Sequence, residues 1–232
     1  MNEIPRTFSA KVLVFGEYSV IVNSMALCLP YQQSEGHLAF RRDKEMFIDN
    51  ELKTFSLYLK KAQEENPSTL KLDLKKFEFD ISCGLHFDSS IPQGHGLGSS
   101  GALCAAIFDR YKTEYYKTIE TTDLIKLKEI FSLMEGHFHG SSSGVDPLVS
   151  YLDRPLLING PGQFDLVNIP DFQDGPGGMF FINTNRARRT EPLVRLFFEK
   201  RKDEAFNDIC TKVLIPTTNK CVTSFLEGDV ES

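Results

Sequence analysis

The chain has 232 residues, of which 41% are hydrophobic and 25% charged, with a formal net charge of −6. This length can bury the core of one large domain or two modest ones. The acidic balance argues against a surface that binds nucleic acid or an anionic membrane. No apolar run approaches the roughly 20 residues that span a bilayer.

Five cysteines are scattered along the chain without a C-x-x-C pair, and the N-terminal residues contain no apolar stretch typical of a signal peptide. An odd number of dispersed cysteines is typical of a reducing compartment. We therefore expect a cytoplasmic protein, because the sequence indicates neither a disulfide framework nor a leader.

The first part of the chain predicts strands followed by a helix. Two apolar runs, 11–15 and 18–22, flank a turn at Gly16 and predict two short strands. Apolar residues at helical spacing predict a helix over 51–65, and strict alternation over 77–81 predicts a half-buried strand.

A glycine-rich loop from Ile91 to Ala102 then runs into an apolar segment that predicts a buried helix, to about Tyr116. Glycines let backbone N–H groups approach phosphate oxygens, and a helix N-terminus adds partial positive charge. The serines of the loop could cap the helix or bind a metal. The loop also fits G-x-G-x-x-G, but Pro92 interrupts the preceding strand that a dinucleotide site requires. A tight strand-to-helix turn is the purely structural alternative.

The next predicted helix, 123–139, carries an acidic residue on its apolar face. Glu135 follows Leu127 and Phe131 at steps of four residues. A buried carboxylate is costly unless it is paired, so Glu135 requires a metal, a lysine or a proton. The alternative is a glutamate near the helix end that reaches solvent.

A second loop of small residues, 140–144, leads into another predicted helix. Asp146 precedes Pro147 at its start, which is also the pattern of a simple helix N-terminus. Later apolar runs predict strands over 154–158, 164–169 and 179–182, and helices over 191–202, over 204–214 and from about residue 219.

Four stretches, 11–20, 94–102, 135–146 and 183–190, occur in the order and spacing of the GHMP kinases, and the chain most resembles the mevalonate kinase group. The match to the phosphate loop of this family is carried by Gly94, Gly96, Leu97, Gly98, Ser99 and Ser100. The resemblance implies an ATP- and Mg²⁺-dependent kinase that phosphorylates a small alcohol, such as mevalonate. Within it, backbone N–H groups of the loop would bind the ATP phosphates.

The resemblance also implies roles for single residues. Asp146 would be the catalytic base toward the acceptor hydroxyl, and Lys11 would lie beside it and stabilise its charge. Glu135 and the hydroxyl of Ser100 would hold Mg²⁺. The residues implied near the acceptor are Glu17, Arg188 and Thr190.

The fold that the resemblance implies is α/β, of the two-layer α+β kind. An N-terminal domain over 1–174 would have a mixed sheet with helices, like domain 2 of ribosomal protein S5. A partial ferredoxin-like domain would follow over 175–232, because the third, glycine-rich family motif is not found after Gly178. The chain is then either a piece of a longer protein or one with a curtailed C-terminal domain, and an open sheet edge would permit a homodimer.

The sequence departs from the family pattern at several positions. Gly101 replaces the usual alanine after the serines, Pro147 replaces an asparagine, and residues 185–187 lack the usual lysine and proline. Two alternatives therefore stay open: a sugar or sugar-phosphate kinase of the same superfamily, or a relative that binds a nucleotide or metabolite without catalysis.

Overall fold

The computed structural model describes residues 5–41, 48–116, 123–160, 162–171, 182 and 190–229. Contacts divide the chain into two compact units, each assembled from separate stretches. Unit 1 comprises Met1–Lys11, Pro30–Pro92 and Leu97–Asp153, and unit 2 comprises Val12–Leu29, Gln93–Gly96 and Arg154–Ser232. The expected boundary at residue 174 lies outside the described residues, and the division into 1–174 and 175–232 stays a prediction.

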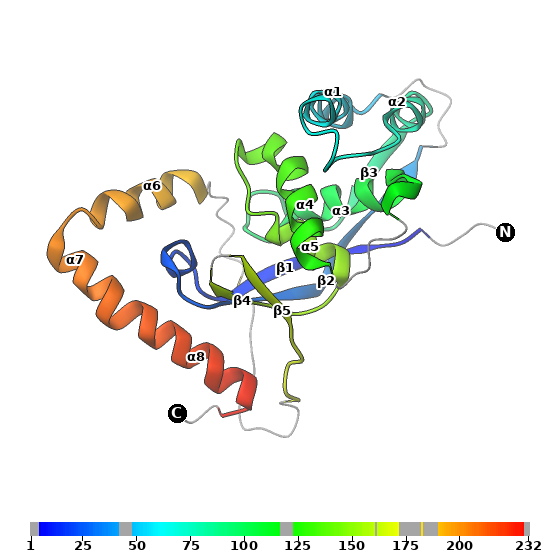
Figure 1. Cartoon of the computed structure of the whole chain (residues 1–232). Coiled ribbons are helices and arrows are strands. Elements are labelled where there is room, and N and C mark those ends of the chain that lie inside the picture. Colours follow the sequence, from blue (N-terminus) through cyan, green and yellow to red (C-terminus); the bar gives the residue numbers. More distant parts are fainter. Residues whose placement is uncertain are drawn as a thin grey trace. The chain divides into compact units, whose positions relative to one another are not determined.

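The strands form one sheet in the order β1-β2-β4-β5, with β3 paired to β2. Their bounds are β1 Phe8–Phe15, β2 Ala26–Phe40, β3 Leu85–Ser89, β4 Leu156–Gly160 and β5 Gln163–Leu166 (Figure 1). The pairs β2–β3, β2–β4 and β4–β5 are antiparallel, with Gly36 opposite Ser89 and Ala26 opposite Ile158. This sheet and its helices confirm the expected α+β class.

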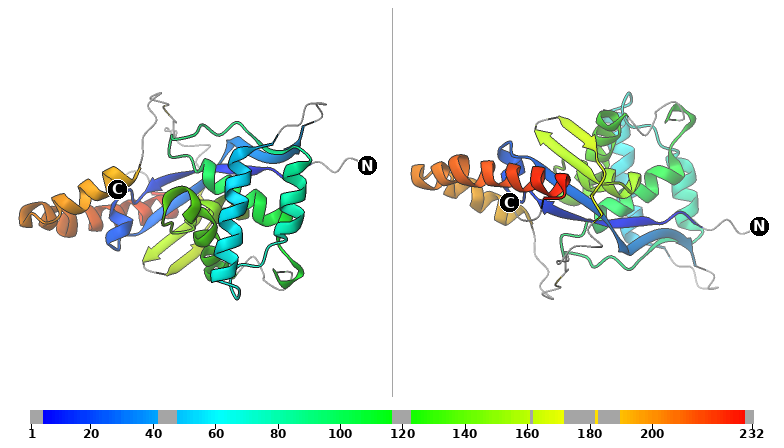
Figure 2. Two further views of the ribbon diagram at one scale, coloured as in Figure 1. Left: turned by 90° about the horizontal axis from the view of Figure 1, so that it is seen from above. Right: turned by 90° about the horizontal axis from the view of Figure 1, so that it is seen from below.

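Unit 1 is dominated by helices. They are α1 Asn50–Glu65, α2 Leu74–Ser82, α3 Ser99–Tyr111, α4 Leu124–His139 and α5 Val145–Leu152, with a 3₁₀ turn at Glu114–Tyr116 (Figure 1). Helix α3 packs against both α4 and α5, and α1 lies beside α2 (Figure 2). Every residue of α3 from Gly101 to Phe108 is buried, which confirms the predicted buried helix.

Aromatic side chains fill the core of unit 1. The ring of Phe108 on α3 lies 5.1 Å from that of Phe131 on α4 and 5.3 Å from that of Tyr151 on α5. Because each contact joins a different pair of helices, the cluster fixes the spacing of α3, α4 and α5. These three helices carry the candidate residues at positions 100, 135 and 146.

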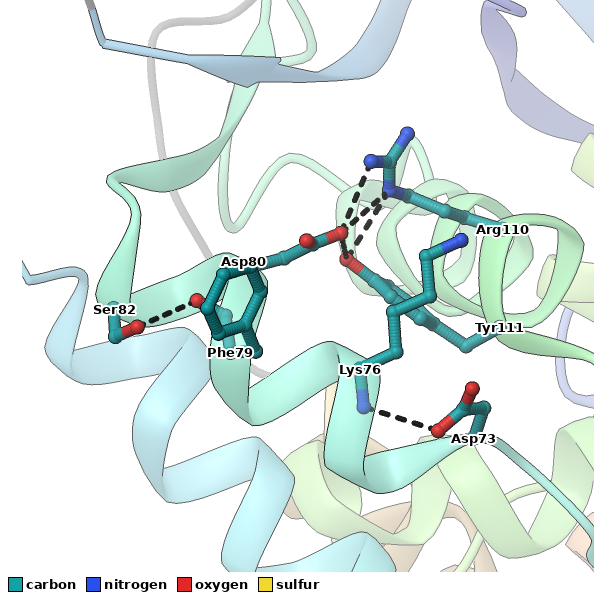
Figure 3. Close-up of polar contacts among 7 residues, drawn as sticks. All are labelled: Asp73, Lys76, Phe79, Asp80, Ser82, Arg110 and Tyr111. Atoms are coloured by element: carbon teal, nitrogen blue, oxygen red, sulfur yellow. Dashed lines mark hydrogen bonds and ion pairs between the residues drawn. The ribbon is translucent and has the colours of Figure 1, made fainter.

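A polar cluster lies between α2 and α3 (Figure 3). Asp80 is 7% exposed, and its Oδ2 accepts hydrogen bonds from Arg110 Nη2 at 3.0 Å and from the Tyr111 hydroxyl at 2.8 Å. The Arg110 guanidinium also lies over the ring of Phe40, 5.2 Å from its centroid. A cation and a phenol thus satisfy this carboxylate, as a buried charge requires.

Unit 2 contains a 3₁₀ helix at Ser19–Val22, the strands β4 and β5, and the helices α6 Thr190–Lys200, α7 Glu204–Ile209 and α8 Ile215–Glu227. A π-helical segment, Cys210–Leu214, joins α7 to α8, so that 204–227 is one continuous helix (Figure 2). Its core holds Leu27, Leu157 and Val222.

Two predicted strands are wrong. Residues 77–81 belong to helix α2, where Leu74, Phe77 and Ile81 are buried at helical spacing while Phe79 is 66% exposed. Residues 18–22 form a turn and the 3₁₀ helix, with Tyr18 at a positive φ of 62°. The strand expected over 179–182 lies outside the described residues, apart from Ile182. No described helix has the length and apolar character needed to cross a membrane.

Candidate functional site

An ion pair joins Lys11 on β1 to Asp146 in the first turn of α5. Lys11 Nζ lies 3.0 Å from Asp146 Oδ1, and the side chain of Lys11 is 11% exposed whereas that of Asp146 is 32% exposed. Asp146 is the second residue of α5, immediately after the N-terminal Val145. The proximity that the resemblance implies is therefore present, with a buried amine and a carboxylate that reaches solvent.

The glycine loop lies against this pair. Leu97 O accepts a hydrogen bond from Lys11 N at 2.9 Å, which ties the loop to β1. A β-carbon on Gly98 would come within 2.8 Å of Lys11 Cγ, and Gly98 has a φ of +73°. Only glycine satisfies both the close approach and the left-handed backbone at this position.

Helix α3 begins directly after the loop and carries no side-chain cap. Gly98 is its N-cap residue, and neither Ser99 nor Ser100 supplies a capping hydrogen bond. The first N–H groups of a helix have no partners within the helix, and here no capping side chain takes them. Gly94 and Gly96 also have positive φ values, both +75°. Among the described residues, the serine cap considered from the sequence is therefore not formed.

Helices α3 and α5 meet at the second glycine of this region. A β-carbon on Gly101 would lie 2.8 Å from both the carbonyl carbon of Asp146 and the nitrogen of Pro147. Such a distance to backbone atoms is shorter than real β-carbons show, so α5 approaches α3 more closely than an alanine would allow. The departure from alanine at this position has a steric reason.

Glu135 is buried on α4, with 3% of its surface exposed, as its apolar face predicts. Its Oε1 accepts a hydrogen bond from Ser100 Oγ at 3.1 Å, and its Oε2 accepts one from Ser142 Oγ. Burial raises the pKa of Glu135 to about 7, and the charge of Asp146 acts in the same direction. The two hydroxyl groups and the charge of Lys11 lower this pKa only in part.

Two contacts of this site have no counterpart in the sequence analysis. Ser142 lies in the small-residue loop, but nothing in its spacing indicates a bond to Glu135. His139 Nε2 lies 3.1 Å from Ser100 Oγ. The step of four residues from Glu135 to His139, one helical turn, is the signal that could have identified the histidine.

The residues at Glu135 fit a magnesium ion. A carboxylate and a hydroxyl are the hard oxygen ligands that Mg²⁺ prefers, and the ion usually takes one or two carboxylates together with phosphates and water. Among the described residues, no group of three His, Cys, Asp or Glu side chains is arranged to hold a metal.

The acceptor-side residues are described less fully. Glu17 is exposed in the turn after β1, and its backbone oxygen accepts a hydrogen bond from Ser19 N at 2.8 Å. Arg188 lies outside the described residues. Thr190 is the first residue of α6, and its side chain also lies outside the description.

A protein-family model matches part of the chain. Residues 58–154 match the model of the GHMP kinases N terminal domain. This part of the chain is therefore similar to that domain. This matched stretch includes the glycine loop, Glu135 and Asp146, whereas Lys11 precedes it. No curated protein matches the sequence.

Solved structures similar to this chain include three mevalonate kinases with TM-scores above 0.5. The enzyme of Methanococcus jannaschii is 17% identical, with a TM-score of 0.57 over 98% of this chain and 74% of that one. The mevalonate kinase of L. major, in complex with R-mevalonate, is 17% identical, with a TM-score of 0.60 over 99% and 71%. A third mevalonate kinase is 16% identical, with a TM-score of 0.55 over 97% and 73%. The chain thus shares its fold with these mevalonate kinases.

Proposed function

We propose that this protein is an ATP-dependent kinase that transfers the γ-phosphoryl group to a small alcohol, with mevalonate or a similar carboxylated alcohol as the acceptor. The observation that carries the proposal is the 3.0 Å ion pair between Lys11 and Asp146, placed against a glycine loop of the GHMP type. The acceptor is inferred from the fold shared with mevalonate kinases, one of them solved with R-mevalonate.

In this proposal Asp146 accepts the proton of the acceptor hydroxyl while the hydroxyl oxygen bonds to the γ-phosphorus. The bond between the γ-phosphorus and its bridging oxygen breaks, and ADP leaves with the electron pair. Lys11 holds the Asp146 carboxylate in place and stabilises negative charge near the reacting oxygen. In phosphoryl transfer the protein mainly positions groups and neutralises charge, so these roles suffice.

The phosphates of ATP are assigned to the uncapped N-terminus of α3. Backbone N–H groups of Gly96, Leu97, Gly98 and Ser99 would donate to phosphate oxygens, aided by the partial positive charge of the helix end. Gly94 would shape the start of this loop through its positive φ.

Ser100 and Glu135 are the residues that would hold Mg²⁺, which when bound neutralises charge on the transferring phosphates. Burial makes the charged form of Glu135 costly, and among the described residues only hydroxyl groups hydrogen-bond to its carboxylate, so a bound cation would stabilise that form. Glu17, Arg188 and Thr190 stay candidates for the acceptor, supported by the resemblance alone. A homodimer also stays a prediction.

The test combines a base variant with a panel of acceptors. We expect Asp146→Ala to lower the turnover number by about 10³-fold or more, because general-base catalysis contributes about 10²–10⁴-fold. ATP binding, followed by calorimetry, should change little. The matched control is Asp165→Ala, which removes an exposed carboxylate on β5 that bonds only to Asn159 among the described side chains.

The acceptor panel should contain mevalonate, related carboxylated alcohols, free sugars and sugar phosphates. ADP release with the carboxylated alcohols alone supports the proposal, whereas release with sugars supports the sugar-kinase alternative. ATP binding without turnover on any acceptor would identify a non-catalytic relative. Near-normal turnover of the Asp146 variant would refute its assignment as the base.

A further inference from the structure

Ser142 occupies a defined place between the two acidic residues of the site. It lies in the loop that connects α4, which carries Glu135, to α5, which carries Asp146. Its hydroxyl donates to Glu135 Oε2, while Ser100 Oγ on α3 donates to Oε1 at 3.1 Å. The two oxygens of one buried carboxylate are therefore held by hydroxyl groups from two different parts of unit 1.

The hydrogen bonds of Ser142 fix the direction in which its proton points. Ser142 Oγ accepts a bond from Gly144 N at 3.0 Å. A serine hydroxyl carries one proton, so the bond that it donates to Glu135 uses the only one it has. The backbone oxygen of Ser142 accepts from Ser132 Oγ on α4 at 2.6 Å. The residue is thus anchored at both its backbone and its side chain.

This anchoring connects Glu135 to the start of α5. Gly144 is the N-cap residue of α5, and Asp146 follows two positions later. A displacement of the loop would therefore move the hydroxyl that orients Glu135. Groups that hydrogen-bond to a metal-ligating carboxylate set its orientation, and their loss typically costs about 10–100-fold in metal affinity or activity.

We propose that Ser142 is a positioning residue that orients the Glu135 carboxylate for a divalent cation. It holds Oε2 on the side of the loop and leaves Oε1, beside the Ser100 hydroxyl, to face the ion. This role rests on the proposed function, in which Glu135 and Ser100 are the magnesium ligands.

A purely structural role for Ser142, as a residue that stabilises the loop, predicts a different result. Ser132 provides the matched comparison, because its hydroxyl supports the same loop without touching Glu135 in any bond that the structure gives. Ser132→Ala should loosen the loop, and Ser142→Ala should loosen it and also free one carboxylate oxygen. Ser142→Thr keeps the hydroxyl and serves as the rescue variant.

The experiment measures Mn²⁺ binding in the presence of ADP, by electron paramagnetic resonance of the free ion. We expect Ser142→Ala to raise the dissociation constant of Mn²⁺ by about 10-fold. Ser132→Ala should leave it nearly unchanged, and Ser142→Thr should restore most of the affinity. Glu135→Gln defines the loss caused by removing the ligand itself. Circular dichroism melting curves show that each variant is folded.

Equal Mn²⁺ affinity of the Ser142→Ala and Ser132→Ala variants would overturn the positioning role and leave the proposed function intact. A native protein whose Mn²⁺ affinity equals that of Glu135→Gln would overturn it too, because Glu135 would then not be a metal ligand. If Ser142→Ala weakens Mn²⁺ binding and Ser142→Thr restores it, yet no acceptor is phosphorylated, the kinase proposal fails and the positioning role stands.

Discussion

Asp80 and Glu135 are both buried acids of unit 1, but their carboxylates have different hydrogen-bond partners. Asp80 is 7% exposed and meets the guanidinium of Arg110 and the hydroxyl of Tyr111 (Figure 3). Glu135 is 3% exposed and meets two neutral hydroxyl groups. Among the described residues, no ion pair joins a Lys or Arg to Glu135, although the charge of Lys11 lowers the pKa of Glu135 in part.

The comparison distinguishes a buried carboxylate that is neutralised by a cation of the fold from one that is suited to a bound cation. The Asp80 cluster has one acid and one cation, so its charges cancel within the fold. Among the described residues, the site holds the acids Glu135 and Asp146 beside Lys11, and the pKa of Glu135 rises to about 7 because of its burial and of Asp146. Charge balance, more than burial, therefore identifies the carboxylate that is suited to bind a cation.

The largest effect that should distinguish the clusters is on turnover. We expect Lys11→Met to lower the turnover number by about 10²–10³-fold, because it removes a preorganised positive charge beside the proposed base. Arg110→Met removes the cation of the other cluster and should leave the turnover of the folded protein nearly unchanged. Steady-state kinetics of both variants with the same acceptor provide the measurement. Similar losses in the two variants would mean that the clusters do not differ in function.

The second effect concerns stability against pH without divalent cations. The pKa of Glu135 is about 7 in the folded protein and 4.5 as the ordinary value, so the folded state keeps its proton between these values. The stabilising contribution of this proton is complete below the lower value and is lost as pH rises through the higher one. The native protein should therefore lose up to about 3 kcal/mol, relative to Glu135→Gln, between about pH 5 and about pH 8.

Urea denaturation of both proteins across this range measures the difference. The Gln variant corrects for all other titrating groups, because its remaining ionisable residues are those of the native protein. Parallel curves for the two proteins would show that Glu135 does not titrate in this window. Added Mg²⁺ should reduce the loss at the higher pH, if the ion takes the place of the proton.

The smallest expected effect is on the stability of the Asp80 cluster. Tyr111→Phe removes one hydrogen bond to Asp80 and should lower the free energy of unfolding by about 1–2 kcal/mol. Arg110 still pairs with Asp80, so neither turnover nor Mn²⁺ affinity should change. A clear loss of Mn²⁺ affinity would instead show that the Asp80 cluster supports the metal site.

The sequence predicts the helices of unit 1 more reliably than its strands. Helix α4 agrees with the prediction within one residue, since Leu127, Phe131 and Glu135 are buried at steps of four. The segment 77–81 fails because alternation also arises when a helix buries Phe77, Asp80 and Ile81 and exposes Phe79. Which aromatic residue faces solvent depends on packing against α1 and α3, and a five-residue pattern does not contain that information.

Of the candidate site, the sequence predicts the main charged residues but not the hydrogen bonds that hold them. A buried acid at position 135 follows from its place on an apolar face, and the pairing of Lys11 with Asp146 follows from the family pattern. The hydroxyl of Ser142 and the ring of His139 meet their partners through the conformation of a loop and the packing of α4 on α3. The helical step from Glu135 indicates which face His139 shares but not its partner Ser100, and the spacing of Ser142 carries no periodic signal at all.

The close contact at Gly101 leaves no room for a side chain at this position. A β-carbon there would lie 2.8 Å from backbone atoms of Asp146 and Pro147 on α5. Any larger residue would have to push the start of α5 away from α3, and with it the carboxylate that we propose as the base.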